Sequence, residues 1–433
     1  MEKIVINGGK SLSGEIEVSG MKNAAVAVIM GSLLVEDKCI IENLSDISDV
    51  KVSFEILRHM GAKVRLINKT TYEVDNTRTV GGKSPSDLVS KMRASYYLLG
   101  AELGRFHNAY VAQPGGCDFG PRPIDYHVKG FEALGATFET ENGCYKITAP
   151  NGLKGTQIFL DFESVGATIN IILAAVKATG LTTIENAAKE PHVVDLANFL
   201  NACGADISGA GTNIIKIKGV KKLHGCTYAI LPDMIEAGTY MVAAAATDGC
   251  LKINNVIPKH LESITAKLTE MGVDIEELDD AIIVRRSGEL NKVNIKTQPY
   301  PGFPTDMNSQ MCVLMCLAKG TSIMTEGVYD NRFKCCDELA RMGAKIKVEG
   351  KTAVIEGIDT LNSAVVKAVN LRGGVAVVIA GLVAHGRTEI EEIYHIERGY
   401  EDMVTKLRGV GADIKKISYP DPIQEAFEYT KAQ

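Results

Sequence analysis

One cysteine of the chain lies in a segment whose composition suits a reactive group. Residues 113–127 read QPGGCDFGPRPIDYH, and the three glycines and three prolines around Cys117 predict a loop rather than a helix or a central strand. Loops held by a rigid scaffold often carry catalytic groups. Beside Arg122, the thiol could act as a nucleophile or a proton donor; an incidental exposed cysteine is the alternative interpretation.

Two basic residues stand where apolar helices are expected to begin. Lys22, followed by Asn23, lies in SGMKNAAV, and Arg93 lies in a similar place in SKMRASYYLLG. A cation at a helix N-terminus is electrostatically unfavourable, so an anion bound there would relieve the conflict. The alternative is a long side chain that extends to water.

Asp306 and three arginines form a third set of candidates. Asp306 lies in PYPGFPTDMNSQM, between a proline-rich turn and an expected helix, where it could cap the helix or act as a general base. Arg332, Arg372 and Arg398 follow later in the chain. Guanidinium groups suit phosphate and carboxylate because they donate two parallel hydrogen bonds, although each arginine could equally be a solvated surface charge.

The sequence predicts no metal site. The eight histidines show no zinc-like spacing with other ligands, Cys312 and Cys316 are expected in the core, and Cys335 and Cys336 lack partners. Ten cysteines without a repeating framework favour reduced thiols in a cytoplasmic protein. No secretory signal is visible, and the longest apolar run, 375–384, is too short to cross a bilayer. The net charge of −6 argues against nucleic acid as the main partner.

The elements that must position these residues follow a sixfold repeat. One pattern recurs in stretches such as HMGAKV, ALGATF and RMGAKI. In it, a glycine follows an apolar residue and is followed by a small residue and an alternating strand. The six glycines, 68 to 74 residues apart, are Gly61, Gly135, Gly204, Gly272, Gly343 and Gly411. Each is interpreted as the left-handed residue that ends an amphipathic helix before a strand.

A second kind of helix is apolar on all sides. NAAVAVIMGSLLVED, ATINIILAAVKATG, EAGTYMVAAAATDG and GGVAVVIAGLVAHG predict helices that are buried all round, with short strands such as TTIENA and CLKINNV after them. Six α/β units of about 70 residues fit a chain of 433 residues best as three per lobe in two similar lobes. The expected boundary lies near Leu231-Pro232.

Together these motifs resemble a known enzyme family. SGMKNAA, KMRAS, PGGCDFGPRPID, SVGAT, IENAAKEP, GFPTDM, NRF and YHIERGYE, in this order, are similar to the UDP-N-acetylglucosamine 1-carboxyvinyltransferases, from residue 1 to about residue 418. The resemblance implies a two-lobed inside-out α/β barrel built from six βαβαββ repeats, with the active site in the cleft between the lobes. One lobe would comprise 22–232 with the Cys117 loop, the other 1–21 with 233–418, and 419–433 would form a C-terminal tail.

The resemblance also implies the activity. Members transfer the enolpyruvyl group of phosphoenolpyruvate to the 3'-hydroxyl of UDP-N-acetylglucosamine by addition and elimination, and they release phosphate. This is the first committed step of peptidoglycan precursor synthesis. The chain would then be a cytoplasmic transferase of cell wall biogenesis, cell shape and cell division, with small molecules as partners and no metal or other cofactor. Because Cys117 is retained, the epoxide phosphonate fosfomycin would be an inhibitor.

The family's functional residues carry over by position. Cys117 would be the acid that protonates the methylene carbon and Asp306 the base for the sugar hydroxyl, with Lys22 and Arg398 also catalytic. The residues implied to bind phosphoenolpyruvate are Lys22, Asn23, Arg122, Arg332 and Arg398. Those implied to bind the nucleotide sugar are Arg93, Arg122, Pro123, Ile124, Asp125, Tyr126, Ser164, Val165, Gly166, Asp306 and Val328.

Three positions depart from the family pattern. Asn370 stands where the family has Asp, Met234 stands where many members have Arg, and the helix after Arg372 begins with Gly373-Gly374, which is expected to loosen it. Because an amide cannot act as a base, Asn370 motivates an alternative: a catalytically weakened paralogue that binds UDP-N-acetylglucosamine in a regulatory role. A related transferase acting on shikimate 3-phosphate is a third interpretation, which the PGGC loop disfavours.

Overall fold

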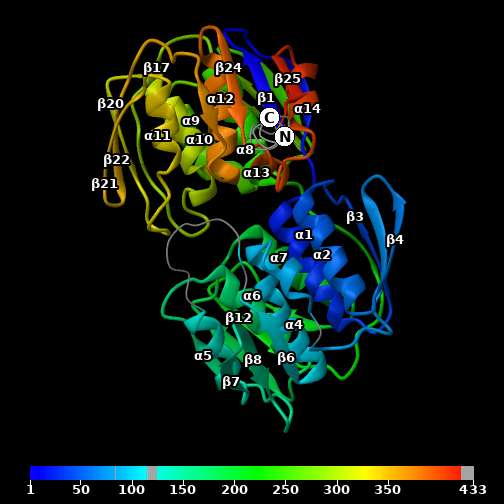
Figure 1. Ribbon diagram of the computed structural model, residues 1–433. Coiled ribbons are helices and arrows are strands. Elements are labelled where there is room, and N and C mark those ends of the chain that lie inside the picture. Colours follow the sequence, from blue (N-terminus) through cyan, green and yellow to red (C-terminus); the bar gives the residue numbers. More distant parts are fainter. Residues whose placement is uncertain (83, 114, 116–123, 421–433) are drawn as a thin grey trace, which may run out of the picture. The chain divides into compact units, whose positions relative to one another are not determined.

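The structure is a computed structural model that describes residues 1–82, 84–113, 115 and 124–420. These residues form two compact units (Figure 1). Unit 1 comprises 1–18, 234–298 and the described residues from 303 onward. Unit 2 comprises the described residues of 19–233 together with 299–302.

Unit 2 contains three sheets and two kinds of helix. The first sheet has the strand order β13 (Thr227–Ala229), β3 (Lys38–Glu42), β5 (Thr71–Asp75) and β4 (Lys63–Asn68). The second has the order β6 (Asn108–Ala112), β8 (Cys144–Thr148) and β7 (Thr137–Glu141). The third has the order β11 (Asp206–Ser208), β12 (Ile214–Lys218), β10 (Leu181–Glu185) and β9 (Gln157–Phe159). The inner helices are α1 (Lys22–Gly31), α4 (Tyr97–Phe106) and α6 (Val165–Ala175). The outer helices are α2 (Ser48–His59), α5 (Asp125–Ala133) and α7 (Pro191–Ala202), and a short helix, α3 (Ser86–Val89), precedes α4.

Unit 1 repeats this plan. Its four-stranded sheets are β23 (Val365–Lys367), β24 (Arg387–Glu391), β1 (Glu2–Asn7) and β25 (Asp413–Ser418); β15 (Asp274–Glu277), β16 (Ala281–Arg285), β14 (Cys250–Asn254) and β2 (Ser13–Glu17); and β18 (Asn294–Lys296), β20 (Thr321–Thr325), β22 (Thr352–Glu356) and β21 (Lys345–Glu349). A small sheet pairs β17 (Leu290–Asn291) with β19 (Ala318–Lys319). The inner helices are α8 (Met234–Ala246), α10 (Asn308–Cys316) and α12 (Leu371–Val383). The remaining helices are α9 (Glu262–Glu270), α11 (Cys335–Arg341), α13 (Tyr394–Glu397) and α14 (Met403–Gly409).

The sheets confirm the βαβαββ repeat. β18, α10, β20, α11, β21 and β22 follow one another in the chain; β18 pairs with β20 in parallel, and β22 pairs antiparallel with both β20 and β21. Three repeats include a strand distant in sequence. β1, at the N-terminus, lies between β24 and β25 (Figure 1), β2 pairs with β14 in parallel, and β13, at the end of unit 2, pairs with β3 near its start. The fold is the expected inside-out α/β barrel of six repeats.

The apolar helices are buried, as their composition predicts. Almost every residue of α1, α4, α6, α8, α10 and α12 is inaccessible to solvent. Helices of this kind have no polar face to present to water, so each unit places them inside and covers them with strands and amphipathic helices. The strands show the complementary pattern: in β12, Ile215 and Ile217 are buried and the other three residues are exposed.

The six repeat glycines adopt the predicted conformation. Their φ angles lie between +90° and +104°, directly after the outer helices α2, α5, α7, α9, α11 and α14. A side chain would strain the backbone in this region, which explains why glycine recurs there. No helix in the part of the chain described here combines the length and the apolar character needed to cross a membrane.

Candidate functional site

In unit 2, Lys22 is the first residue of α1 and is held by acidic side chains. Its Nζ lies 2.9 Å from Oδ2 of Asp49, at the start of α2, and its backbone N–H donates to Oδ2 of Asp233 at 3.3 Å. Only 14% of the Lys22 side chain and 4% of the Asp49 side chain are exposed. The interpretation that Lys22 extends to water is therefore wrong. The two carboxylates offset the cost of a cation at a helix N-terminus. Asn23, next in α1, is half-buried.

Two of the residues expected to bind the nucleotide sugar come from different repeats of unit 2. Arg93 begins a short 3₁₀ helix (Arg93–Tyr96) that leads into α4, and its guanidinium lies 5.6 Å from the ring centroid of Tyr96. Gly166 lies in the first turn of α6, where an added Cβ would be 2.6 Å from Oη of Tyr96 and 3.0 Å from Cε1 of His127. The first turns of α5 and α6 and the start of α4 thus meet around Tyr96, and the close approach requires glycine at 166.

His127 is neutral and serves to hold these helices together. Burial, with the nearby Arg93 charge as a further cause, lowers the pKa of His127 to about 3. Asn170 accepts a hydrogen bond from the Gly100 N–H through Oδ1, so its amide nitrogen donates to Nδ1 of His127 at 2.8 Å. This assigns the ring proton to Nε2. A group with such a low pKa is not a proton donor at neutral pH, so His127 positions its neighbours.

The other expected sugar-binding residues of unit 2 surround the same helix starts. Ile124 is buried, Asp125 is exposed at the beginning of α5, and Tyr126 is half-buried. Ser164 caps α6, because its hydroxyl accepts a backbone N–H of the first turn at 3.3 Å, and the half-buried Val165 follows it. Cys117, Arg122 and Pro123 lie outside the described residues.

In unit 1, Asp306 lies between two arginines. It belongs to a 3₁₀ turn (Thr305–Met307) just before α10. Its Oδ1 accepts from Nη2 of Arg332 at 2.6 Å, and its Oδ2 accepts from Nη2 of Arg372 at 2.9 Å. The arginine side chains are 2% and 4% exposed, whereas the Asp306 side chain is 27% exposed. The cluster thus presents a carboxylate that solvent or a ligand can reach, fixed from behind by two guanidinium groups.

Further hydrogen bonds fix the two guanidinium groups. Nε of Arg332 donates to the carbonyl of Thr305 at 3.2 Å, and Nη1 of Arg372 donates to Oη of Tyr400 at 3.0 Å. The Tyr400 hydroxyl is bonded to Oγ1 of Thr239 on α8 at 2.8 Å. The sequence offers Arg372 only as one of three anion-binding candidates, and residue type alone does not predict its pairing with Asp306.

Glu326 is a buried acid that sequence reasoning missed. Its Oε2 accepts from Thr305 at 3.1 Å and from Asn308 at 2.9 Å, and its Oε1 accepts the backbone N–H groups of Val328 at 2.9 Å and Tyr329 at 3.2 Å. It therefore ties the loop that carries Val328 to the turn that carries the Asp306 carboxylate. A single Glu after a strand gives no sequence signal for such a role. Val328 is half-buried, as is Arg398, which follows α13.

The departures from the family pattern have local explanations. Asn370 is the N-cap of α12, and its Oδ1 accepts the N–H of Gly373 at 2.8 Å. Gly374 packs so closely that a Cβ would lie 2.8 Å from Cβ of Ala368 and Cγ1 of Ile396. α12 nevertheless runs without a break to Val383, so the expected loosening is not seen. Met234 is buried at the start of α8.

Comparison with known proteins identifies the family. Residues 6–407 match EPSP synthase (3-phosphoshikimate 1-carboxyvinyltransferase). The chain is 57% identical over 417 residues to UDP-N-acetylglucosamine 1-carboxyvinyltransferase 3 of Caldanaerobacter subterraneus subsp. tengcongensis, covering 96% of this chain and 100% of the relative. The chain belongs to the UDP-N-acetylglucosamine 1-carboxyvinyltransferase family. The enzyme of that name from Clostridium botulinum is 54% identical over 418 residues, with 96% of this chain and 100% of the relative covered.

Solved structures of this enolpyruvyl transferase fold agree. The enolpyruvyl transferase NikO from Streptomyces tendae is 26% identical, with a TM-score of 0.86 over 97% of this chain and 99% of that protein. EPSP synthase from Acinetobacter baumannii, at 20% identity, has a TM-score of 0.73 over 96% of this chain and 100% of its own. That second likeness shows the shared fold alone.

Proposed function

We propose that this protein transfers the enolpyruvyl group of phosphoenolpyruvate to the 3'-hydroxyl of UDP-N-acetylglucosamine and releases phosphate. The observation that carries the proposal is the 57% identity, over the whole length, to a UDP-N-acetylglucosamine 1-carboxyvinyltransferase. The two charged clusters support it, because a reaction between two anionic substrates needs fixed cations and a positioned base. The loop sequence PGGC around Cys117 favours the nucleotide sugar over shikimate 3-phosphate as acceptor.

Asp306 is the proposed base. Its oxygens accept hydrogen bonds from Arg332 and Arg372, and 27% of the side chain is exposed, so a sugar hydroxyl can reach the carboxylate. The two arginines fix the carboxylate orientation, which is what a general base requires. Once Asp306 takes the proton, the arginines keep their charge, and a bound phosphate or carboxylate can use it. Arg332 and Arg398 are proposed to hold phosphoenolpyruvate in this way.

Lys22 is the proposed cation on the other substrate-binding unit. Paired with Asp49 at 2.9 Å, its ammonium is held at the start of α1, next to the half-buried Asn23. An arriving phosphate can compete with Asp49 for the ammonium, because Lys carries three donors. We assign Lys22 to phosphate binding and to assistance when phosphate leaves.

The chemistry balances with Cys117 as the acid. The sugar oxygen forms a bond to C2 of phosphoenolpyruvate as Asp306 takes its proton, while the Cys117 thiol gives a proton to C3. This yields a tetrahedral phospho-lactoyl intermediate. The Cys117 thiolate then takes a proton back from C3 as phosphate leaves C2 with the proton held by Asp306, which restores the double bond, now attached to the sugar oxygen. The thiol in this role would also open the epoxide ring of fosfomycin.

The product class places the protein at the first committed step of peptidoglycan precursor synthesis. Both substrates are small, charged and soluble, which supports a cytoplasmic location and a role in cell wall biogenesis, cell shape and division. Arg93, Arg122, Pro123, Ile124, Asp125, Tyr126, Ser164, Val165, Gly166 and Val328 are proposed to bind the nucleotide sugar with Asp306. The regulatory paralogue is not favoured, since Asn370 has a capping role that an active enzyme can share.

The deciding experiment is phosphate release from phosphoenolpyruvate by wild type and Cys117→Ala, with and without UDP-N-acetylglucosamine. We expect release by wild type only when the nucleotide sugar is present, and a loss of at least about 10²-fold in the variant. Replacement of the nucleotide sugar by shikimate 3-phosphate is the matched substrate control. Release with shikimate 3-phosphate alone, or none from folded wild type, would contradict the proposal.

A further inference from the structure

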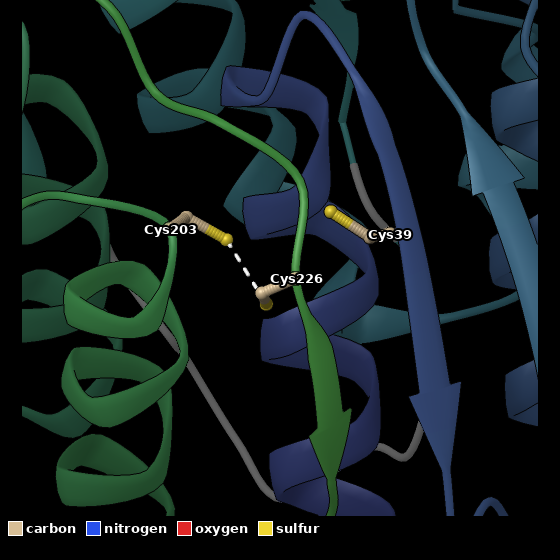
Figure 2. A group of neighbouring side chains, drawn as sticks. All are labelled: Cys39, Cys203 and Cys226. Atoms are coloured by element: carbon tan, nitrogen blue, oxygen red, sulfur yellow. Dashed lines mark hydrogen bonds between the residues drawn. The ribbon is translucent and has the colours of Figure 1, made fainter.

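Three cysteines of unit 2 converge although they are far apart in sequence (Figure 2). Cys39 lies on β3, Cys203 directly follows α7, and Cys226 directly precedes β13. Their sulfurs all lie within 4.8 Å of one another, and those of Cys203 and Cys226 are 3.3 Å apart. Cys39 and Cys203 are buried, and Cys226 is half-buried. None of these residues belongs to the proposed catalytic clusters.

The backbone around the three thiols is fixed by its own hydrogen bonds. The N–H of Ile40 donates to the carbonyl of Cys226 at 2.9 Å, and the N–H of His224 donates to the carbonyl of Cys203 at 2.9 Å. A Cβ at Gly225 would lie 1.9 Å from the carbonyl oxygen of Lys38, so this approach of the two segments requires glycine. The sulfurs are therefore presented by a preorganised frame, as a ligand site needs.

The sulfur triangle matches the size of a metal site. With a zinc–sulfur distance of about 2.3 Å, sulfurs bound to one ion are separated by about 3.8 to 4.0 Å. The observed edge of 3.3 Å and the limit of 4.8 Å bracket that value, so small side-chain rotations would bring all three sulfurs to one centre. Half-buried Cys226 leaves an entry path from solvent.

We propose that Cys39, Cys203 and Cys226 form a binding site for a soft d¹⁰ cation, Zn²⁺ or Cu⁺. Thiolate sulfur is the ligand that both ions prefer. Zn²⁺ would complete its tetrahedron with a water on the Cys226 side, whereas Cu⁺ needs only the three sulfurs. The bound ion would join β3, the end of α7 and the start of β13, and so stabilise unit 2. The proposal is independent of the proposed function.

The four cysteines of α10 and α11 in unit 1 differ. Burial raises the pKa of Cys316 to about 12, and among the described residues these sulfurs do not gather within 4.8 Å of one another as the three of unit 2 do.

Metal binding to reduced, metal-free protein tests the proposal. The full chain carries Cys117→Ser, so that the loop thiol cannot contribute, and is titrated anaerobically with Co²⁺ as a spectroscopic probe. We expect one equivalent to give a thiolate-to-cobalt charge-transfer band, which Zn²⁺ then removes by displacement. In parallel arms, Zn²⁺ and Cu⁺ compete against chromophoric chelators of known affinity to show which ion is held more tightly.

Matched variants assign the ligands. Cys226→Ser, at the half-buried position, and Cys39→Ala should each weaken binding at least about tenfold. Cys250→Ser, exposed in unit 1, and Cys316→Ala, buried there, should leave affinity unchanged. Circular dichroism verifies folding, and the bound ion should raise the Tm of the parent protein but not of Cys226→Ser.

Several results would overturn the proposal. One is a folded, reduced parent protein that gives no charge-transfer band and does not compete for either ion. Another is binding that survives both Cys226→Ser and Cys39→Ala. A Cys203–Cys226 disulfide, found by mass spectrometry in protein purified without added oxidant, would assign the pair a redox role instead.

Discussion

The charged clusters of the two units are opposite in sign. In unit 2 one ammonium, that of Lys22, is held by the carboxylate of Asp49, and Asp233 accepts from its backbone. In unit 1 one carboxylate, that of Asp306, is held by the guanidinium groups of Arg332 and Arg372. Counted over these side chains, the unit 2 cluster carries an excess of negative charge and the unit 1 cluster an excess of positive charge.

This difference separates two ways of binding an anion. The two guanidinium groups of unit 1 lie behind one carboxylate, so protonation of that carboxylate leaves their charge to act on a bound phosphate or carboxylate. Lys22 is paired with Asp49, with which an arriving anion has to compete. We therefore expect the unit 1 cluster to dominate the chemical step and the unit 2 cluster to tune substrate binding.

The largest effect is expected at the carboxylate of unit 1. Asp306→Asn removes the proposed base and leaves two buried guanidinium groups without their counter-charge, so kcat should fall about 10³-fold. UDP-N-acetylglucosamine binding, measured by calorimetry, should change far less, which separates chemistry from folding. Asp306→Glu is the matched control that keeps the charge. A variant Asp306→Asn within tenfold of wild type would exclude Asp306 as the base.

Removal of the unit 2 cation should have a smaller effect. Lys22→Ala loses a donor to the leaving phosphate, and kcat/KM for phosphoenolpyruvate should fall about 10²-fold. Lys22→Arg retains the charge and should recover part of the loss, mainly in KM. Steady-state phosphate release measures both. Equal kinetics for Lys22→Ala and wild type would mean that unit 1 alone supplies the anion site.

Asp49→Asn sharpens the comparison, because it leaves the cation and removes only its partner. Without the carboxylate at 2.9 Å the ammonium is less well oriented. We expect the activation free energy to rise by about 1.4 kcal/mol, which lowers kcat about tenfold. KM for phosphoenolpyruvate should fall or stay constant, since the substrate no longer competes with Asp49. If KM instead rises tenfold and kcat is unchanged, Asp49 does not compete with the substrate.

The smallest effect is expected for Asn370→Asp. Asn and Asp cap helices about equally well, so the free energy of unfolding should change by less than about 0.5 kcal/mol. Turnover should stay within about threefold of wild type, as shown by denaturant unfolding and phosphate release on the same preparations. A gain of about 10²-fold in turnover would instead support the alternative that the wild-type protein is a catalytically weakened paralogue.

Much of the fold was predictable because its helices and their ends depend on local sequence patterns. The six repeat glycines indicated where helices end, and all of them adopt positive φ. The alanine- and glycine-rich stretches indicated helices that are buried all round, as α6 and α12 are. The order of the motifs, from SGMKNAA to YHIERGYE, was enough to indicate the family, and the comparisons confirm it.

The partners of the candidate residues were not predictable in the same way. Lys22 and Asp49 lie at the starts of two helices of one repeat, whereas Asp306 and Arg372 lie at helix starts of neighbouring repeats. Side-chain type does not tell which helix starts meet. Glu326 gave no sequence signal at all, although it binds the segments before α10 and after β20.

The sequence by itself determined the repeat, the buried helices, the identity of the candidate catalytic residues and the family, because each depends on residue type and spacing along the chain. Only the tertiary structure decided that β1 closes a sheet with β24 and β25, that a carboxylate lies between two guanidinium groups, and that Cys39, Cys203 and Cys226 meet. These contacts join segments up to several hundred residues apart. They arise when buried helices pack and strands pair, and local sequence does not encode that pairing.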